Sequence, residues 1–268
     1  MNSFASPVLL TGAAGKLGRV LARALAERGW RVRLTDNTPF PDPLPANAQF
    51  HQADLSDEEA MRDLAGGCRA IIHFGAVSKP TDAFDQVLDP NIRGLHNIYE
   101  AARRQGARVV FASSHHAVGF YERRTTLDHD CAFRPDGFYG LSKAYGELMG
   151  RLYWDQHGVE SVNIRIGACV PEPRNARMMS IWLSHDDLVA CVERSVLADC
   201  TGYSIVWGVS NNSKSWWRKD DRERLGWAPQ DSADVFADRF PKAAHDAEEP
   251  YQGGAFLRPA PLQDVLGK

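Results

Sequence analysis

The chain has 268 residues, of which 44% are hydrophobic and 24% are charged. This length and composition are typical of one large or two small globular domains, and they exclude a wholly disordered or fibrous chain. Lysine and arginine number 31 against 34 aspartates and glutamates, a formal net charge of −3. The balance argues against a nucleic-acid binder, for which a basic domain or stripe would be expected.

The cysteines and the apolar segments indicate the cellular compartment in which the protein is expected. The five cysteines are scattered and form no C-x-x-C pair, so neither a disulfide framework nor a zinc site is predicted. The first residues hold no basic segment and only a short apolar run, unlike a signal peptide. No stretch approaches the ~20 apolar residues that cross a bilayer. We therefore expect a soluble cytoplasmic protein with no membrane partner.

Short apolar runs alternate with longer segments of helical period from the start of the chain to Gly167. The apolar runs predict strands over 7–11, 31–35, 49–53, 70–74, 108–112 and 161–166. The segments of helical period are 15–28, 57–64, 84–104 and 137–157. Apolar strands joined by such helices predict an α/β, doubly wound (Rossmann) fold, in which helices cover both faces of a parallel sheet.

The regular alternation ends at Gly167. Beyond it we expect a helix over 184–197, a lone strand over 203–206 and a polar, tryptophan-rich remainder. The interpretation is a Rossmann core over 1–167 that includes the chemistry-bearing residues. The region 168–268 is predicted to be a small substrate-covering cap and C-terminal tail, integrated with that core.

A glycine-rich loop, TGAAGKLG over 11–18, joins the first strand to the first helix. Its three glycines fit a tight turn, a close backbone approach to a pyrophosphate and close helix–strand packing. The N-terminus of the helix then offers free N–H groups to the phosphates. A plain structural turn is the alternative, but the strand–turn–helix context favours a dinucleotide site. The contacts predicted here are Gly12, Gly15, Lys16, Leu17 and Gly18.

Asp36 ends the second predicted strand, eighteen residues after Gly18. A carboxylate at this point accepts hydrogen bonds from the adenosine 2′- and 3′-hydroxyls and repels a 2′-phosphate. The alternative is a turn aspartate before Asn37 and Pro39. No basic residue directly follows Asp36, so NAD is favoured over NADP as the cofactor.

A tyrosine and a lysine four residues apart, Tyr139 and Lys143, share one helical face. A phenol with an ordinary pKa near 10 is a poor base at neutral pH, and a neighbouring ammonium favours its phenolate form. Such a tyrosine can take a proton from a hydroxyl while hydride leaves the same carbon. The spacing alone is common on solvated helices. Ser114, however, leaves a predicted strand at its carboxyl end, where such sheets bind ligands, and it can hold the substrate oxygen beside Tyr139.

Together these residues resemble the extended short-chain dehydrogenase/reductase family. The resemblance rests on the glycine loop, Asp36 and the Tyr139/Lys143 pair, joined by Asp54, Leu55, Gly75, Ala76, Asn91 and Ser114. It implies that Ser114, Tyr139 and Lys143 form a catalytic triad. Asp54 and Leu55 would frame the adenine of NAD, Gly75 and Ala76 would belong to the cofactor site, and Asn91 would support Lys143 through water.

Longer segments resemble the uronate dehydrogenases nearly end to end. They include FASSHHAVGFY over 111–121, RPDGFYGLSKAYGE over 134–147 and NIRIGACVPEPRNARMMSIWLSHDD over 163–187. This resemblance implies oxidation of the C1 hemiacetal of a hexuronate, such as glucuronate or galacturonate, to a lactone with NAD. The implied substrate contacts are Ser78, Ser114, His116, Tyr139 and Arg177, with Arg177 as the anion clamp.

The departures from that family fall in the predicted pocket. The family's asparagine is His115 here, its serine is Ala168, and the segment after Ser78 begins with Lys79 and differs in sequence. His115 and Lys79 are therefore predicted as additional, cationic substrate contacts. The pocket thus loses one hydrogen-bond donor, at Ala168, and gains two, at His115 and Lys79. The substrate could therefore carry a sulfonate at C6 in place of the carboxylate, as in a sulfoquinovose dehydrogenase that forms sulfogluconolactone.

Other functions also stay open at this stage. One is a nucleotide-sugar epimerase or dehydratase that retains NAD between half-reactions, and another is a redox-sensing regulator that kept only the dinucleotide fold. No metal site is predicted, because the adjacent His115 and His116 would face different directions along a strand and no third ligand is suitably spaced. Arg177 could also be a solvated loop arginine. A homo-oligomer is expected.

Overall fold

The structure, a computed structural model, describes residues 6–79, 81–240 and 249–254. Seven parallel strands in these ranges form one sheet in the order β3-β2-β1-β4-β5-β6-β9. The strands are β1 (Val8–Thr11), β2 (Val32–Asp36), β3 (Ala48–Gln52), β4 (Ala70–His73), β5 (Arg108–Ser114), β6 (Ser161–Ile166) and β9 (Tyr203–Gly208). A small second sheet pairs β7 (Ala168–Cys169) with β8 (Trp182–Leu183). The predicted doubly wound fold is confirmed.

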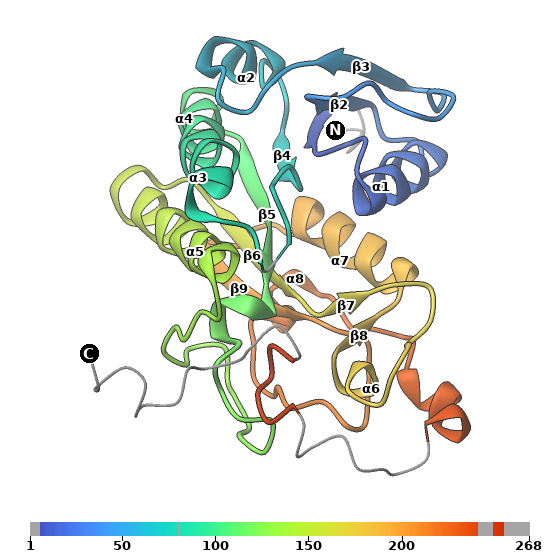
Figure 1. Ribbon diagram of the computed structural model, residues 1–268. Coiled ribbons are helices and arrows are strands. Elements are labelled where there is room, and N and C mark those ends of the chain that lie inside the picture. Colours follow the sequence, from blue (N-terminus) through green and yellow to red (C-terminus); the bar gives the residue numbers. More distant parts are fainter. Residues whose placement is uncertain (1–5, 80, 241–248, 255–268) are drawn as a thin grey trace, which may run out of the picture.

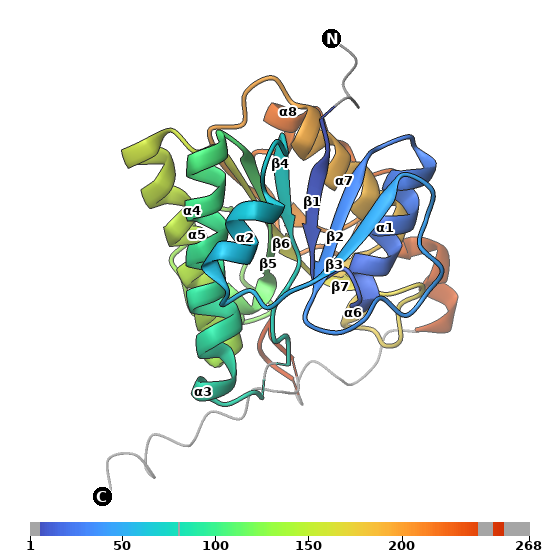
Figure 2. The same ribbon diagram turned by 90° about the horizontal axis from the view of Figure 1, so that it is seen from above.

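Helices cover both faces of the sheet (Figure 1), and the view from above separates the two layers (Figure 2). One layer contains α2 (Glu58–Leu64), α4 (Gly94–Gln105) and α5 (Phe138–His157). The other contains α1 (Lys16–Glu27) and α7 (His185–Leu197). The shorter helices are α3 (Phe84–Val87), α6 (Met178–Ile181), α8 (Arg222–Leu225) and the 3-10 helices His115–Val118 and Ala233–Arg239.

The alternation of side chains along each strand divides the core in two. Leu10 and Val110 point to the cluster that contains Leu25 of α1 and Val192 of α7. Their neighbours in the strands, such as Leu9, join the cluster built with α4 and α5. Because both faces of each central strand are buried, the strands read as continuous apolar runs, which is the pattern that predicted a covered parallel sheet.

The helix predicted over 84–104 is interrupted. A π-helical turn, Leu88–Arg93, lies between α3 and α4. Pro90 lies in this turn, and proline both lacks an N–H donor and clashes with the carbonyl four residues earlier, so the regular α-helical ladder cannot continue through it. Such π-turns are frequent at functional sites. Here the turn buries Asn91, which is 4% exposed.

The strand predicted as lone, over 203–206, is not alone. It is β9, which extends to Gly208 and pairs with β6 as an edge strand of the main sheet. Val206 and Val192 of α7 share the core cluster of β1. The region after Gly167 therefore contributes a strand and a helix to the central layers, in addition to the loops at one end of the sheet.

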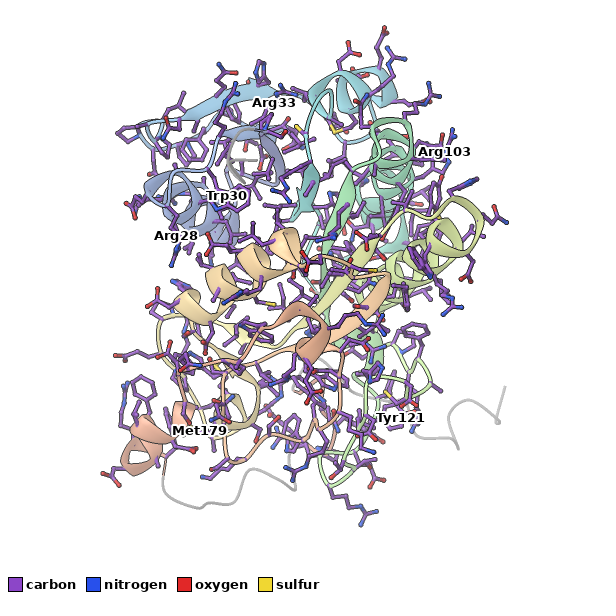
Figure 3. The ribbon with its side chains drawn as sticks, turned by 180° about the vertical axis from the view of Figure 1, so that it is seen from behind. Arg28, Trp30, Arg33, Arg103, Tyr121 and Met179 are labelled. Atoms are coloured by element: carbon purple, nitrogen blue, oxygen red, sulfur yellow. The ribbon has the colours of Figure 1, made fainter. Side chains whose placement is uncertain are left out.

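Those loops gather at the carboxyl ends of the strands. In the view from behind, Tyr121 and Met179 lie toward the end of the molecule opposite Arg33 (Figure 3). The segment 249–254 joins this end: Glu122 and Tyr251 form an antiparallel bridge, and the Gly253 N–H donates to the Gly119 carbonyl. Gln252 is completely buried there. Residues far apart in the sequence thus meet beside the loop that follows β5.

Within the described ranges, no helix is long and apolar enough to cross a membrane. The same ranges hold no group of three or more histidine, cysteine, aspartate or glutamate side chains placed to bind a metal ion.

Candidate active site

The glycine loop lies where the strand order reverses, between β1 and β4, which is the point at which doubly wound sheets bind ligands. Gly12 has a positive φ of 69°, and a Cβ there would lie 2.5 Å from the Gly75 nitrogen. A Cβ on Gly18 would lie 2.0 Å from the Gly12 carbonyl oxygen. No side chain caps the N-terminus of α1 at Gly15. The loop therefore leaves a side-chain-free surface next to an uncapped helix N-terminus, which fits a dinucleotide pyrophosphate.

Lys16 and Leu17 begin α1, with Lys16 exposed and Leu17 half-buried. Asp36 ends β2 beside this loop. One of its carboxylate oxygens accepts a hydrogen bond from the Ala14 N–H at 3.0 Å, and the other accepts from the Thr38 N–H at 3.2 Å. These contacts orient the carboxylate at the edge where the adenosine hydroxyls of NAD would lie.

The remaining predicted cofactor residues lie on the loops that follow β3 and β4. Asp54 accepts hydrogen bonds from the Ser56 N–H and hydroxyl, at 2.8 and 2.7 Å, which lower the pKa of its carboxyl group. A Cβ on Gly75 would lie 2.9 Å from Leu55 Cδ1. Ala76 follows Gly75 and is half-buried. These two segments lie next to each other, and the second also lies beside the glycine loop, since the Gly75 N–H donates to the Thr11 hydroxyl at 3.2 Å.

The structure brings together Ser114, Tyr139 and Lys143. Ser114 is the last residue of β5. Its hydroxyl accepts a hydrogen bond from the His116 N–H at 3.2 Å, and it lowers the pKa of the Tyr139 phenol. Lys143 lies one helical turn after Tyr139 on α5, 3% exposed, with Nζ 5.5 Å from the Tyr139 ring centroid. The neighbouring Ser113 donates to the buried Glu147 at 2.5 Å, so the alternation along β5 points Ser114 to the opposite side of the strand.

The ionisation of this pair differs from the expectation. Burial raises the pKa of Tyr139 to about 12, against the opposing effect of the Ser114 hydrogen bond. Burial also lowers the pKa of Lys143 to about 7. Lys143 is not among the groups that shift the pKa of Tyr139, so the expected lowering by the lysine is not seen.

Asn91 lies next to the triad, and its direct contacts are with the loop after β4 and with α5. Its amide pairs with the Val77 backbone, donating to the carbonyl and accepting from the N–H, each at 2.9 Å. It also donates to the Ser142 hydroxyl at 2.9 Å. Asn91 thus ties the loop after β4 to the residue that precedes Lys143.

The adjacent histidines do not diverge, as they would along a strand. The chain turns into a 3-10 helix directly after Ser114, which places the ring centroids of His115 and His116 4.2 Å apart. His116 Nδ1 lies 2.6 Å from the Asp136 carboxylate, and its ring meets the Tyr139 ring edge-on. Sequence reasoning missed Asp136, although it lies three residues before Tyr139 in the RPDGFY segment.

His115 is buried between two partners. Its Nδ1 lies 3.0 Å from the Ile166 carbonyl oxygen, and its Nε2 lies 3.0 Å from Arg177 Nη2. Burial, His116 and Arg177 all lower its pKa well below the ordinary value. The contacts and the lowered pKa favour a neutral ring at this position over the predicted cationic donor.

Arg177 precedes α6 and reaches back toward the triad. Its Nε and Nη2 donate to the Gln252 carbonyl oxygen. Burial lowers the pKa of its guanidinium to about 10, a value at which it stays charged at neutral pH. It is therefore no solvated loop arginine. Gln252 escaped the sequence reasoning because nothing in the polar remainder distinguished it.

Ser78 and Lys79 are exposed on the loop after β4. The Lys79 N–H donates to Asp82 at 3.0 Å. Two tryptophans lie farther in: Trp207 and Trp217 stack 4.7 Å apart in a buried cluster, and the Trp217 ring lies 5.9 Å from the His115 ring. This cluster packs against the His115 ring on the side of Trp217.

The NAD dependent epimerase/dehydratase family matches residues 8–185. The chain belongs to this family. It is 45% identical to uronate dehydrogenase of Pseudomonas syringae pv. tomato over 262 residues, which cover 96% of this chain and 95% of the relative. The predicted resemblance is confirmed.

Solved structures agree with the sequence comparison. Glucuronic acid dehydrogenase from Chromohalobacter salexigens has a TM-score of 0.89 at 40% identity, covering 94% of this chain and 96% of that one. Uronate dehydrogenase from Agrobacterium tumefaciens, solved as a tyrosine-to-alanine variant with NAD, has a TM-score of 0.86 at 42% identity, covering 94% and 97%.

Proposed function

We propose that this protein oxidises the C1 hydroxyl of a hexuronate, such as glucuronate or galacturonate, to the lactone with NAD. The observation that carries the proposal is that Ser114, Tyr139 and Lys143 lie together at the carboxyl end of β5. The glycine loop lies at the switch point of the same sheet, and the half-buried Arg177 guanidinium contacts His115, the residue after Ser114. This arrangement offers a dinucleotide site, a proton acceptor and an anion site at the same end of the sheet. The likeness to uronate dehydrogenases supports it.

The proposed cofactor residues are those of the glycine loop together with the segments after β2, β3 and β4. Gly12, Gly15 and Gly18 with the N-terminus of α1 hold the pyrophosphate, and Asp36 takes the adenosine hydroxyls. Bound NAD supplies the hydride acceptor. Asp54, Leu55, Gly75, Ala76 and Asn91 complete the site, with Lys16 and Leu17 at the first turn of α1.

The proposed chemistry is carried by residues at the end of β5 and on α5. Ser114 donates to the C1 oxygen and orients it toward Tyr139, which accepts the hydroxyl proton. When Lys143 is protonated, its charge favours the phenolate. His116, which is oriented by Asp136, forms a hydrogen bond with a sugar hydroxyl. Ser78 and Lys79 contact the substrate from the solvent-exposed loop after β4. Arg177 binds the anion at C6.

Release of NADH against a panel of sugars tests this proposal. The panel contains glucuronate, galacturonate, sulfoquinovose, glucose and glucose 6-phosphate, each with NAD and with NADP. We expect the two uronates with NAD to give the highest kcat/KM. Glucose as the best substrate, or isomerised sugar with no net NADH, would overturn the proposal. A preference for sulfoquinovose would mean that the anion at C6 of the substrate is a sulfonate and not a carboxylate.

We also propose that the protein works as a homo-oligomer through α5. Four of its apolar side chains lie at helical spacing and are 43–56% exposed: Phe138, Leu141, Leu148 and Leu152. A stripe on one helix can pair with its own copy across a two-fold axis. Light scattering should give a multimer for the wild type and for Leu44→Glu, a matched change at an exposed leucine outside α5, and a monomer for Leu148→Glu. A monomeric wild type contradicts the proposal.

The proposed compartment is the cytoplasm. The five cysteines, Cys68, Cys131, Cys169, Cys191 and Cys200, all lie in the described ranges and all are free. Unpaired cysteines are usual in a reducing compartment. The proposed division of labour assigns the cofactor and the triad to residues 1–167 and the cover of the substrate to residues 168–268, which contain Arg177 and Gln252.

A further inference from the structure

Both forked edges of the Arg177 guanidinium carry protein acceptors. The edge formed by Nε and Nη2 faces the Gln252 carbonyl oxygen, with Nε at 3.2 Å. The edge formed by Nη1 and Nη2 has His115 Nε2 at its Nη2 end, at 3.0 Å. Among the described residues, no acceptor contacts Nη1. A guanidinium has five N–H donors in a fixed plane, so Nη1 is the part that remains for a ligand.

The Gln252 side of this arrangement is rigid. The Gln252 side chain accepts a hydrogen bond from Trp217 Nε1 at 2.8 Å and donates to the Thr125 carbonyl at 2.8 Å. Its backbone N–H donates to the Tyr121 carbonyl. Three hydrogen bonds thus fix the position of Gln252, whose carbonyl oxygen Arg177 contacts.

The partners of His115 define its tautomer. A carbonyl oxygen only accepts, so Nδ1 must carry the hydrogen that faces Ile166. A guanidinium only donates, so Nε2 must present a lone pair to Arg177. The charged or titratable groups that face the ring are Arg177 and His116, the latter paired with Asp136. Both neighbours disfavour a second proton on His115, as does burial.

We propose that His115 is a positioning residue: as a neutral acceptor it holds Arg177 so that Nη1, and not a forked edge, meets the anion at C6 of the substrate. The inference rests on the proposed oxidation of acidic sugars and adds to it a residue that sets specificity. His115 does not touch the anion itself, since both ring nitrogens are engaged within the protein.

Steady-state kinetics of two variants test this role. His115→Leu replaces the imidazole with an apolar side chain of similar size and so removes the hydrogen-bond acceptor. We expect its KM for glucuronate to rise about tenfold (about 1.4 kcal/mol) with kcat within twofold, and its kcat/KM for neutral glucose to stay unchanged. His115→Gln returns an acceptor oxygen at similar reach and should restore most of the loss. An unchanged KM in His115→Leu, or His115→Gln no better than His115→Leu, overturns the proposal.

A second measurement does not depend on turnover. In the protein labelled with ¹⁵N-histidine, two-bond ¹H–¹⁵N spectra distinguish the two neutral tautomers from the imidazolium, and the signal lost in His115→Gln identifies the residue. We expect the neutral Nδ1–H form from pH 6 to pH 8.5. An Nε2–H tautomer, or an imidazolium at pH 7, overturns the positioning role. If the wild type oxidises no acidic sugar, the proposed function fails while this spectrum still reports on His115.

Discussion

The cofactor side and the substrate side of the crevice are built in different ways. On the cofactor side, the TGAAGKLG loop lies within eight consecutive residues, and its geometry depends on backbone and on missing side chains, as at Gly12 and Gly18. On the substrate side, His115, Arg177 and Gln252 come from three segments, separated by 62 and 75 residues, and are held by side-chain contacts.

This difference has a physical cause. A phosphate is recognised by backbone N–H groups, which every residue carries, so the chain needs only the right turn and enough space. A specific sugar acid is recognised by a few side-chain donors at fixed angles, and those must be fixed by neighbours from elsewhere in the fold. Changes on the two sides should therefore separate cofactor binding from substrate choice.

The largest effect is expected between the two sides, at the proton acceptor. Tyr139→Phe removes the base but no proposed contact to the dinucleotide, so turnover should fall about 10²- to 10⁴-fold while the Kd for NAD stays within about twofold. Stopped-flow NADH formation and calorimetric titration with NAD measure the two quantities. A variant that retains more than about one tenth of the wild-type rate would contradict the proposed role.

Gly18→Ala tests the cofactor side. The new Cβ would lie 2.0 Å from the Gly12 carbonyl oxygen, so the loop must shift, and the Kd for NAD should rise about 100-fold. Gly29→Ala is the control, because Gly29 lies two residues after the end of the same helix and has open space around it, although its φ is 87°. The control should lose about 1–2 kcal/mol of stability and bind NAD normally. Equal NAD affinity in both variants would refute the steric argument.

Arg177→Ala tests the substrate side. A hydrogen bond to a charged group contributes about 1.5–3 kcal/mol, so kcat/KM for glucuronate should fall about 10- to 150-fold. Glucose, which lacks the anion, should be nearly insensitive, and NAD affinity should not change. Equal losses for both sugars would mean that Arg177 acts through the fold, since it also binds the Gln252 carbonyl.

The smallest effect is expected at Asp36. Asp36→Ala removes acceptors for the adenosine hydroxyls and relieves the repulsion of a 2′-phosphate. The Kd for NAD should rise about tenfold, and that for NADP should fall. Fluorescence titrations with both dinucleotides measure this change. A wild type that already prefers NADP would remove the basis for the assignment.

The sequence by itself determined the central architecture. Strands such as β1 and β4 read as short apolar runs because both of their faces are buried, and this pattern required no knowledge of long-range contacts. The same held for the glycine loop and for Tyr139 and Lys143, whose spacing on one helix fixes their relation. The helix predicted over 84–104 is interrupted at Pro90 by a π-helical turn, in which Asn91 donates to the Val77 carbonyl of the neighbouring loop.

The tertiary structure alone decided what surrounds the substrate. Whether His115 is a cation or a neutral acceptor depends on Ile166 and Arg177, which the sequence does not place beside it. The raised pKa of Tyr139 likewise follows from burial, a property of the packed site. Gln252, at the far end of the chain, meets Arg177 only after folding. Local spacing encodes the backbone of a site, whereas protonation states and hydrogen-bond directions arise from groups that folding brings together.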